Sequence, residues 1–400
     1  MKVLFKNIKQ LLQIRDPDVR KVAGKDMGEL PVLDNAFLVT ENDRILDFGT
    51  MEEIPDINAD LEVDASGKML LPSWCDSHTH LVYAGNREKE FVDRIRGLSY
   101  EEIAARGGGI LNSARQLGLS SEDEIFEQSS KRLEEIMQLG TGAVEIKSGY
   151  GLTTESELKM LKVIKRLSES YPIEVKATFL GAHAFPEPFR DSPDKYVDLI
   201  CDEMIPKVAE AQLAEFIDAF CEKGYFSVDQ TQRIIERGQA FGLVPKIHVN
   251  QFNSIGGIQA AIESKALTVD HLEVMTDDDF SDLERSEVMP VALPSCSYFL
   301  GIPYTPGREM IDRGMALAIA TDFNPGSTPS GNMNFALSTA CIKMGLTPEE
   351  AINAATINGA FAMNLSQSLG SITRGKLANL ILTKEIPSYG FLPYAFGSNL

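Results

Sequence analysis

The chain is poor in cysteine and has no long apolar run, and each of these features excludes certain classes of protein. Only five of its 400 residues are cysteines (Cys75, Cys201, Cys221, Cys296 and Cys341), without a CxxC pair. An odd, scattered set argues against a disulfide framework or a thiolate zinc site. No stretch reaches the about 18 apolar residues of a membrane span, and MKVLFKNIKQ at the start lacks the apolar core of a signal peptide. We expect a cytoplasmic protein with no membrane partner.

Positive charge is also scarce. Lysine and arginine number 38 against 58 aspartates and glutamates, which gives a formal net charge of −20. A phosphate backbone or an anionic bilayer would be repelled by this field, so we expect no nucleic-acid partner. A small anionic substrate is not excluded, because a single arginine in a pocket outweighs the overall field at that point.

Eight short apolar runs alternate with amphipathic segments from Lys68 onward, a pattern typical of βα units around a parallel sheet. The runs are Met69 to Cys75, Ala143 to Ile146, Val175 to Leu180, Phe216 to Cys221, Val244 to His248, Leu267 to Val269, Val291 to Leu293 and Ala316 to Ala320. The seventh is the weakest, because prolines bracket it. Their number and order predict a (β/α)8 barrel. A doubly wound sheet is the alternative, but it usually carries a glycine-rich turn after its first strand, where this chain has His-Thr-His.

The two ends of the chain have a different sequence pattern, with short strand-like segments in place of alternating strands and helices. Ala36 to Val39 and Ile45 to Phe48 predict two strands around a turn, and Ser371 to Ile372 and Leu380 to Thr383 predict strand-like pieces near the other end. We therefore expect residues 1–70 and 366–400 to build one small β domain beside a barrel of residues 71–365.

Three predicted helices have recognisable N-terminal signals in the sequence. Ser121 with Glu124, and Thr154 with Glu157, have the spacing of a capping box. Thr347-Pro348 places proline at the first helical position.

All five histidines follow predicted barrel strands: His78, His80, His183, His248 and His271. They come at or just past the ends of the first, third, fifth and sixth strands, the rim where this fold gathers catalytic groups. Residues i and i+2 of a strand face the same side, so His78 and His80 should both point into the barrel mouth. The alternative is a pair of ordinary polar residues at a strand end.

A metal site is the prediction that unites four of these residues. His78 and His80 from the first strand should meet His248 from the fifth and Asp322 from the eighth. Taken singly, a buried histidine is more often a hydrogen-bonded core residue, and an aspartate often caps a helix. As a set, three imidazoles and a carboxylate suit one ion of zinc or iron.

Such an ion lowers the pKa of a bound water to about 7 and polarises a carbonyl, which is the chemistry of a metal-dependent hydrolase. His271 and His183 are then candidates for proton transfer and oxyanion stabilisation. The alternative for both is a supporting role that orients the ligands.

Seven segments carry a family resemblance: DSHTHLVYAGNREKEF (76–91), GGGI (107–110), EIKSGYGL (145–152), TFLGAHAFP (178–186), KIHVNQ (246–251), DHLE (270–273) and ATDFNPGS (320–327). With them the chain resembles, over nearly its whole length, the imidazolonepropionase family of the amidohydrolase superfamily. The resemblance implies a distorted barrel with a β-sandwich made from both chain ends, and a homodimer. It also implies the hydrolysis of the cyclic amide 4-imidazolone-5-propanoate to N-formimidoyl-L-glutamate in histidine degradation, by attack of metal-bound hydroxide on the ring carbonyl.

The resemblance also assigns residues. His78, His80, His248 and Asp322 correspond to the metal ligands, and the positions that contact the substrate are Arg87, Tyr150, His183, Asn324, Gly326 and Ser327. The guanidinium of Arg87 suits the carboxylate of a propanoate, although a surface ion pair with Glu88 or Glu90 is the alternative. The glycines beside Tyr150 permit close approach to a ligand or simply form a turn. Likewise, the 324–327 loop either binds the ligand or only leads into the next helix.

One position departs from the family pattern. Members usually carry a carboxylate two or three residues after the fifth-strand histidine, where this chain has Asn250 and Gln251. An amide cannot accept a proton near neutral pH. Proton transfer would then fall to Asp322 or His271, while Gln251 hydrogen-bonds the substrate.

Two other functions stay open at this point. One is a deaminase or hydrolase of another small heterocycle on the same scaffold. The other is a non-catalytic barrel paralogue, a class that typically loses its metal ligands.

Overall fold

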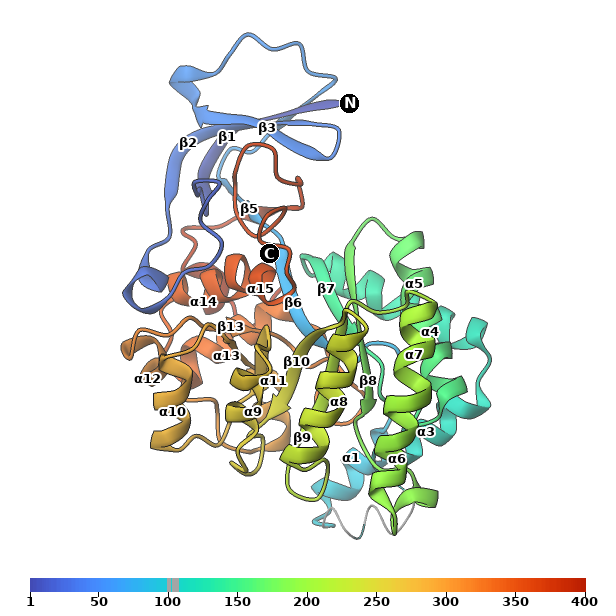
Figure 1. Cartoon of the computed structure of the whole chain (residues 1–400). Helices are drawn as coiled ribbons and strands as arrows, with labels where there is room; N and C mark the ends of the chain where they lie inside the picture. Colours follow the sequence, from blue (N-terminus) through green and yellow to red (C-terminus); the bar gives the residue numbers. More distant parts are fainter. Residues whose placement is uncertain (99–101, 103–107) are drawn as a thin grey trace.

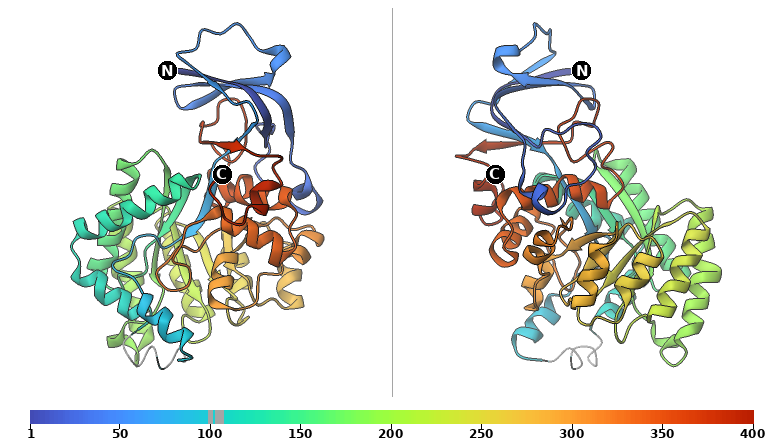
Figure 2. Two further views of the ribbon diagram at one scale, coloured as in Figure 1. Left: turned by 180° about the vertical axis from the view of Figure 1, so that it is seen from behind. Right: turned by 60° about the vertical axis from the view of Figure 1, so that its left-hand side comes forward.

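Two β-sheets organise the protein in the computed structural model, which describes residues 1–98, 102 and 108–400. The larger is an eight-stranded sheet in the order β13-β12-β11-β10-β9-β8-β7-β6, and the smaller has six strands drawn from both ends of the chain. In Figure 1 the small sheet stands above the barrel, and Figure 2 shows the same two parts from two other sides. The predicted (β/α)8 barrel with a small β domain from both chain ends is confirmed.

The barrel strands run parallel and match the eight predicted runs in order. Parallel strands covered on both faces read as continuous apolar runs, which is why the sequence located them. They are β6 Trp74–Thr79, β7 Thr141–Lys147, β8 Glu174–Ala182, β9 Phe216–Cys221, β10 Val244–Val249, β11 Thr268–His271, β12 Met289–Ala292 and β13 Ala318–Ile319.

The first predicted run is wrong in one respect: it contains two strands of different sheets. Lys68–Pro72 forms β5 of the small sheet, and β6 of the barrel begins at Trp74. The backbone N–H of Ser73 bonds to the carbonyl of Asn379, whereas that of Trp74 bonds to the carbonyl of Gly140. The chain thus changes sheets at one residue, and a continuous apolar run carries no sign of it.

The first and last barrel strands meet at the rim. Thr79 forms an isolated bridge with Phe323, and the N–H of His80 donates to the carbonyl of Phe323 at 2.8 Å. One residue earlier, the N–H of Asp322 donates to the carbonyl of His78 at 3.0 Å. The contact that joins the two strands therefore brings together predicted metal ligands that lie far apart in the sequence.

Helices surround the barrel (Figure 1). The longer ones are α3 Ile110–Leu119, α4 Glu122–Gln138, α5 Thr154–Ser170, α8 Val228–Ala240 and α13 Met333–Met344. The shorter ones are α1 Glu88–Ile95, α6 Pro193–Leu199, α7 Ile205–Glu210, α9 Gly257–Glu263, α10 Asp277–Glu284, α11 Pro294–Leu300, α12 Gly307–Asp312, α14 Pro348–Ala355, α15 Ile357–Ala362 and α16 Phe391–Tyr394. Among the described residues, no helix is both long enough and apolar enough to cross a bilayer.

Two of the three predicted helix starts are confirmed and one is wrong. Ser121 and Thr347 form capping boxes at the starts of α4 and α14. At α5 the cap is Thr153, whose hydroxyl accepts from the N–H of Ser156. Glu157 instead turns inward and accepts the N–H groups of the loop before the helix. Burial of this carboxylate beside three backbone donors outweighs a capping contact at the surface.

The small sheet has the order β14-β5-β1-β2-β3, with β4 paired to β1. Its strands are β1 Lys2–Leu12, β2 Val32–Glu41, β3 Arg44–Thr50, β4 Leu61–Asp64, β5 Lys68–Pro72 and β14 Leu380–Glu385. Antiparallel pairing of β14 with β5 joins the two chain ends, and Ile372 adds a bridge to Ile14. Its core consists of apolar side chains, among them Ile8, Leu11 and Leu70.

Candidate metal centre and active site

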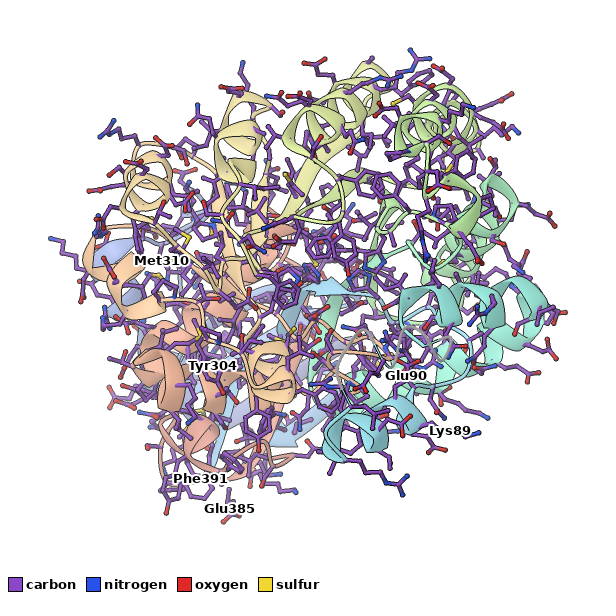
Figure 3. The ribbon with its side chains drawn as sticks, turned by 90° about the horizontal axis from the view of Figure 1, so that it is seen from below. Lys89, Glu90, Tyr304, Met310, Glu385 and Phe391 are labelled. Atoms are coloured by element: carbon purple, nitrogen blue, oxygen red, sulfur yellow. The ribbon has the colours of Figure 1, made fainter. Side chains whose placement is uncertain are left out.

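A cavity of about 890 Å³ opens at the C-terminal rim of the barrel, the side seen from below in Figure 3, where Glu90 on α1 is labelled. Every predicted site residue except His78 lines it: His80, Arg87, Tyr150, His183, His248, Gln251, His271, Asp322, Asn324, Gly326 and Ser327. Its wall includes the aromatic side chains of Phe91, Phe252 and Phe299 together with charged residues of α1 such as Glu90. The cavity thus combines apolar surface with a few convergent polar groups, as small-molecule sites commonly do.

The five histidines form one cluster at the floor of this cavity. The ring of His78 lies at the centre, 5.3 Å from that of His80, 4.5 Å from that of His248 and 5.6 Å from that of His271. His183 stacks on His80 with ring centroids 5.0 Å apart. The strand ends predicted from sequence therefore converge, and His78 and His80 face the same side as expected.

Two buried aspartates fix the orientation of two of these rings. Nδ1 of His78 donates to Asp270 at 2.6 Å, and Nδ1 of His248 donates to Asp218 at 2.8 Å. With the proton on Nδ1, the Nε2 atom of each ring keeps its lone pair for another partner. Neither Nε2 has a hydrogen-bond partner in the described part of the chain, although both are buried. A carboxylate behind a histidine is the usual support of a metal ligand.

Asp322 completes the group. Its Oδ1 lies 3.6 Å from Nε2 of both His78 and His80. The hydroxyl of Ser327 donates to Oδ2 at 3.1 Å, and the amide of Asn324 donates to the backbone carbonyl of Asp322 at 2.7 Å. The backbone of Asp322 has a φ of 56°, a conformation that a loop must hold in place.

The donor set fits a metal ion. The ligand atoms of His78, His80 and Asp322 lie within 4.8 Å of one another, as do those of His78, His248 and His271. Two partnerless imidazole nitrogens, a third imidazole and a carboxylate offer an ion the neutral nitrogens and anionic oxygen that zinc or iron accepts. His78, His80, His248 and Asp322 are the residues able to hold it, and His271 borders the same space.

A buried ionic network lies beneath the histidines, and sequence reasoning missed it. The ammonium of Lys147 contacts Glu145 at 2.6 Å and Asp218 at 2.9 Å, and lies 3.6 Å from Asp270. Lys246 pairs with the other oxygen of Glu145. A signal was present, because these charged residues interrupt runs that otherwise predict buried strands, and a buried charge requires a partner.

The surroundings set the charge of each group. Burial, reinforced by Lys147 and by the neighbouring imidazoles, holds the pKa of His78 and His80 well below the ordinary value. Burial also lowers the pKa of His248 to about 4, against the opposing effect of Asp218. Burial alone would raise the pKa of Asp218, but His248 and Lys147 bring it below its usual range. The three candidate ligand histidines are therefore neutral near pH 7, as metal binding would require.

His271 and His183 differ in charge. Burial alone would lower the pKa of His271, but Glu273, whose Oε1 lies 3.3 Å from Nδ1, raises it above the ordinary value. Burial, together with the neighbouring His248, lowers the pKa of His183 to about 3. Nδ1 of His183 lies 3.0 Å from the carbonyl of Gly149, which can only accept, so the proton sits on Nδ1 and Nε2 is an acceptor. His271 thus suits proton transfer, and His183 suits an N–H group of a ligand better than an oxyanion.

Arg87 lies in the cavity wall rather than on the open surface. Its Nε donates to Glu90 at 2.8 Å, so the predicted ion pair exists, but both side chains are only 13% exposed. Its guanidinium packs so closely on Gly326 that a Cβ at that position would collide with it. Gly326 therefore leaves room for the guanidinium at the cavity.

Tyr150 is buried beside His183, with ring centroids 5.3 Å apart. Glu157 holds the loop that carries it, accepting from the N–H groups of Gly149 at 3.1 Å, Gly151 at 2.7 Å and Leu152 at 2.8 Å. The glycines beside Tyr150 therefore belong to a loop that is pinned from below rather than to a free turn.

The structure separates the two amides that stand where the family pattern has a carboxylate. Asn250 turns away from the cavity and its amide donates to Asp279 at 3.2 Å. Gln251 lines the cavity, and its amide lies 3.7 Å from the sulfur of Cys296. The side chain of Asn324 is also committed, since its carbonyl accepts from the N–H groups of Gly326 and Ser327 at 2.7 and 2.8 Å. Asn324 thus shapes the loop of Asp322.

Comparison with known sequences places the chain among metabolic hydrolases. A family model described as the amidohydrolase family matches residues 69–396. Two similar proteins are both named imidazolonepropionase. The one from Flavobacterium johnsoniae is 65% identical, covering 100% of this chain and 97% of its own length, and the one from Christiangramia forsetii is 64% identical with the same coverage.

Solved structures agree on the fold. Guanine deaminase from E. coli matches with a TM-score of 0.74 at 13% identity, covering 100% of this chain and 96% of its own. An adenosine deaminase from Xanthomonas campestris with bound zinc matches with a TM-score of 0.70 at 14% identity, covering 98% and 88%. At such low identity these likenesses concern the arrangement of the chain and not its substrate.

Proposed function

The chain belongs to the imidazolonepropionase family of amidohydrolases, and we propose that it hydrolyses the ring amide of 4-imidazolone-5-propanoate to N-formimidoyl-L-glutamate, a step of histidine degradation. The observation that carries this proposal is one juxtaposition. Imidazole nitrogens that have no hydrogen-bond partner among the described residues and the carboxylate of Asp322 line the floor of a cavity whose wall presents the guanidinium of Arg87. A hydrolytic centre and a carboxylate receptor thus face the same space.

One metal ion, zinc or iron, is proposed on His78, His80, His248 and Asp322. When bound, it supplies a Lewis acid for the ring carbonyl and lowers the pKa of the water that attacks it. Asp270 and Asp218 keep Nε2 of His78 and His248 unprotonated and aimed at the ion's position. Ser327 restrains Oδ2 of Asp322.

The substrate's two ends call for different partners. The propanoate carries a negative charge that the fork of Arg87 can hold through paired hydrogen bonds. Tyr150 adds a hydroxyl donor from the pinned loop, and Gly326 keeps the space for the guanidinium. Nε2 of His183 accepts a ring N–H, and Gln251 offers its amide to the ring's polar edge. These contacts orient the ring amide over the histidine cluster.

Hydrolysis requires two proton movements. The attacking water gives up a proton as its oxygen bonds to the ring carbonyl carbon, and the ring nitrogen takes up a proton as the C–N bond breaks. Asp322 is the carboxylate of the histidine cluster that lines the cavity, and burial raises its pKa above the ordinary value. His271, whose pKa Glu273 raises above the ordinary value, delivers the second proton. Neither amide at positions 250 and 251 takes part in these transfers.

The decisive test is turnover of 4-imidazolone-5-propanoate with metal content measured on the same sample. We expect activity proportional to bound zinc or iron, lost on chelation and restored by metal. Full activity of metal-free protein would refute the proposal. An analogue without the propanoate tests the alternative substrate class, because unchanged binding of that analogue would favour a hydrolase of neutral heterocycles.

Two sequence-based expectations complete the proposal: a cytoplasmic location and a homodimer. All five cysteines are free thiols, which suits a reducing compartment. Fractionation of the source cells and light scattering of the purified protein would check the two expectations.

A further inference from the structure

Three buried side chains beside the proposed metal centre form a second cluster of metal-binding character. His271 ends β11, Glu273 follows it by two residues, and Cys296 lies on α11. One potential ligand atom from each lies within 4.8 Å of the other two. We propose that His271, Glu273 and Cys296 form a separate site for zinc or another thiol-binding divalent ion, and that filling this site inhibits the enzyme by occupying His271.

The carboxylate of Glu273 supplies the first independent support. Its Oε1 lies 3.3 Å from Nδ1 of His271 and accepts from the hydroxyl of Ser297 at 3.2 Å. Its Oε2 is buried and has no hydrogen-bond partner among the described residues. A buried carboxylate oxygen without a partner costs free energy, which a cation at this point would recover.

The donor types select the ion. A thiolate, an imidazole and a carboxylate are all common zinc ligands, whereas magnesium and calcium avoid sulfur. Ligand atoms around one zinc ion stand about 3–4 Å apart, so the observed cluster needs only small side-chain rotations to close on it. The amide N–H of Gln251 donates to the sulfur of Cys296 at 3.7 Å and so helps to hold this side chain in place.

Occupation of the site must displace a proton. An ordinary thiol has a pKa of about 8.5, so the sulfur of Cys296 carries its hydrogen near neutral pH in the empty site. When an ion binds, the S–H bond is lost, the sulfur–metal bond forms and the proton passes to solvent. The site therefore binds soft ions that can meet this cost, and it releases a proton for each ion bound.

Local charge leaves room for a second cation. The buried carboxylates of Glu145, Asp218 and Asp270 lie against the ammonium groups of Lys147 and Lys246. Glu273 and Asp322 lie against imidazoles instead, so five carboxylates and two ammonium groups leave an excess of three formal negative charges. One divalent ion on the histidine cluster leaves one negative charge. Loss of the Cys296 proton adds another. A second divalent ion then returns this interior to neutrality.

The functional consequence rests on the proposed function, whereas the binding itself does not. His271 lines the catalytic cavity and is proposed to deliver a proton to the leaving nitrogen. An ion bound to the imidazole of His271 prevents this ring from donating a proton. Excess zinc should therefore inhibit an enzyme that one equivalent activates.

The test is a cobalt titration of the holoenzyme already loaded with one equivalent of metal. Cobalt bound to a thiolate gives a sulfur-to-metal charge-transfer band in the near ultraviolet, which ligands of nitrogen and oxygen do not give. We expect this band to grow only with the second equivalent and to be absent in Cys296→Ser. The matched control is Cys341→Ser, which removes the partly exposed thiol of the chain and should retain the band. Glu273→Gln should weaken binding of the second equivalent at least about tenfold.

Inhibition is measured separately, with each variant compared with its own activity at one equivalent of zinc. Wild type and Cys341→Ser should lose most activity in excess zinc, and Cys296→Ser should not. A band that appears with the first equivalent would put Cys296 on the first ion and overturn the proposal, as would a band that persists in Cys296→Ser or no second equivalent at all. A second equivalent that binds with the thiolate band but leaves activity unchanged would retain the site and refute the role of His271.

Discussion

The interior of the barrel and the interior of the small sheet are equally buried, yet they are built from opposite chemistry. The small sheet covers Ile8, Leu11 and Leu70, all 0% exposed. The barrel encloses Lys147 and Lys246 at the same 0% exposure, with three carboxylates around them. An apolar side chain contributes roughly 1.5–3 kcal/mol on burial, whereas a buried ion pair at best breaks even with apolar residues of the same shape.

The difference shows what each interior is for. The small sheet joins the two chain ends by backbone pairing of β14 with β5 and by apolar packing. The barrel interior carries polar groups because Asp218 and Asp270 must hold the rings of His248 and His78. Lys147 lowers the pKa of Asp218, and both lysines oppose the rise that burial causes in the pKa of Asp270. The barrel interior thus sacrifices some folding stability to position the site. We therefore expect variants of the barrel interior to lose bound metal as well as stability, and variants of the small sheet to lose stability alone.

The largest effect is expected from Lys147→Met. The methionine preserves volume but leaves Asp218 and Asp270 without their shared cation, and removing one partner of a buried ion pair costs about 3–5 kcal/mol. Urea denaturation should report this loss of unfolding free energy, and metal analysis should show a depleted site. Leu70→Ala in the small sheet should also cost about 2–5 kcal/mol but keep its metal. Equal metal content in both variants would contradict the division between the two interiors.

Removing a ligand should spare stability more than activity. His248→Ala takes away one proposed ligand and the partner of Asp218, and kcat should fall at least about 10²-fold with loss of bound metal. Steady-state kinetics and metal analysis on one preparation would measure both. A variant that keeps full metal and activity would exclude His248 as a ligand.

Acid should weaken the barrel through its buried neutral histidines. His183 has a pKa of about 3 in the folded protein against an ordinary 6.5. As pH falls from 6.5 toward 3, the unfolded chain takes up a proton that the folded protein refuses, so stability is lost on acidification. His183→Asn should therefore reduce the slope of unfolding free energy against pH in this window by about 1.4 kcal/mol per unit. Identical slopes would mean that His183 is not held neutral.

The smallest effect belongs to the cavity wall. Gly326→Ala places a methyl group against the guanidinium of Arg87 and should raise KM about tenfold with little change in kcat, because it disturbs binding more than chemistry. Gly118→Ala in α3 is the matched control, since a Cβ there meets nothing within 4 Å. An unchanged KM would show that Arg87 does not need its place on Gly326 to hold the substrate.

The sequence by itself located the eight barrel strands and brought together the candidate metal ligands. Fully covered parallel strands are uninterrupted apolar runs, and the rim of a barrel collects whatever follows them, so His248 and Asp322 could be placed together from spacing alone. Predictions from local sequence were wrong where contacts with residues elsewhere in the fold decided the structure. Glu157 does not form the predicted capping box but accepts hydrogen bonds from the loop that carries Tyr150. The apolar run around Ser73 is divided between two sheets at that residue.

Only the tertiary structure decided which groups touch across the barrel. Asp218 and Asp270 reach their histidines from other strands, and Cys296 meets Glu273 from another element. Between Asn250 and Gln251, the turn of the backbone set which amide faces the cavity. Periodicity describes the side of an element on which a residue lies. Contacts between distant elements depend on the curvature and closure of the whole sheet, which no local pattern encodes.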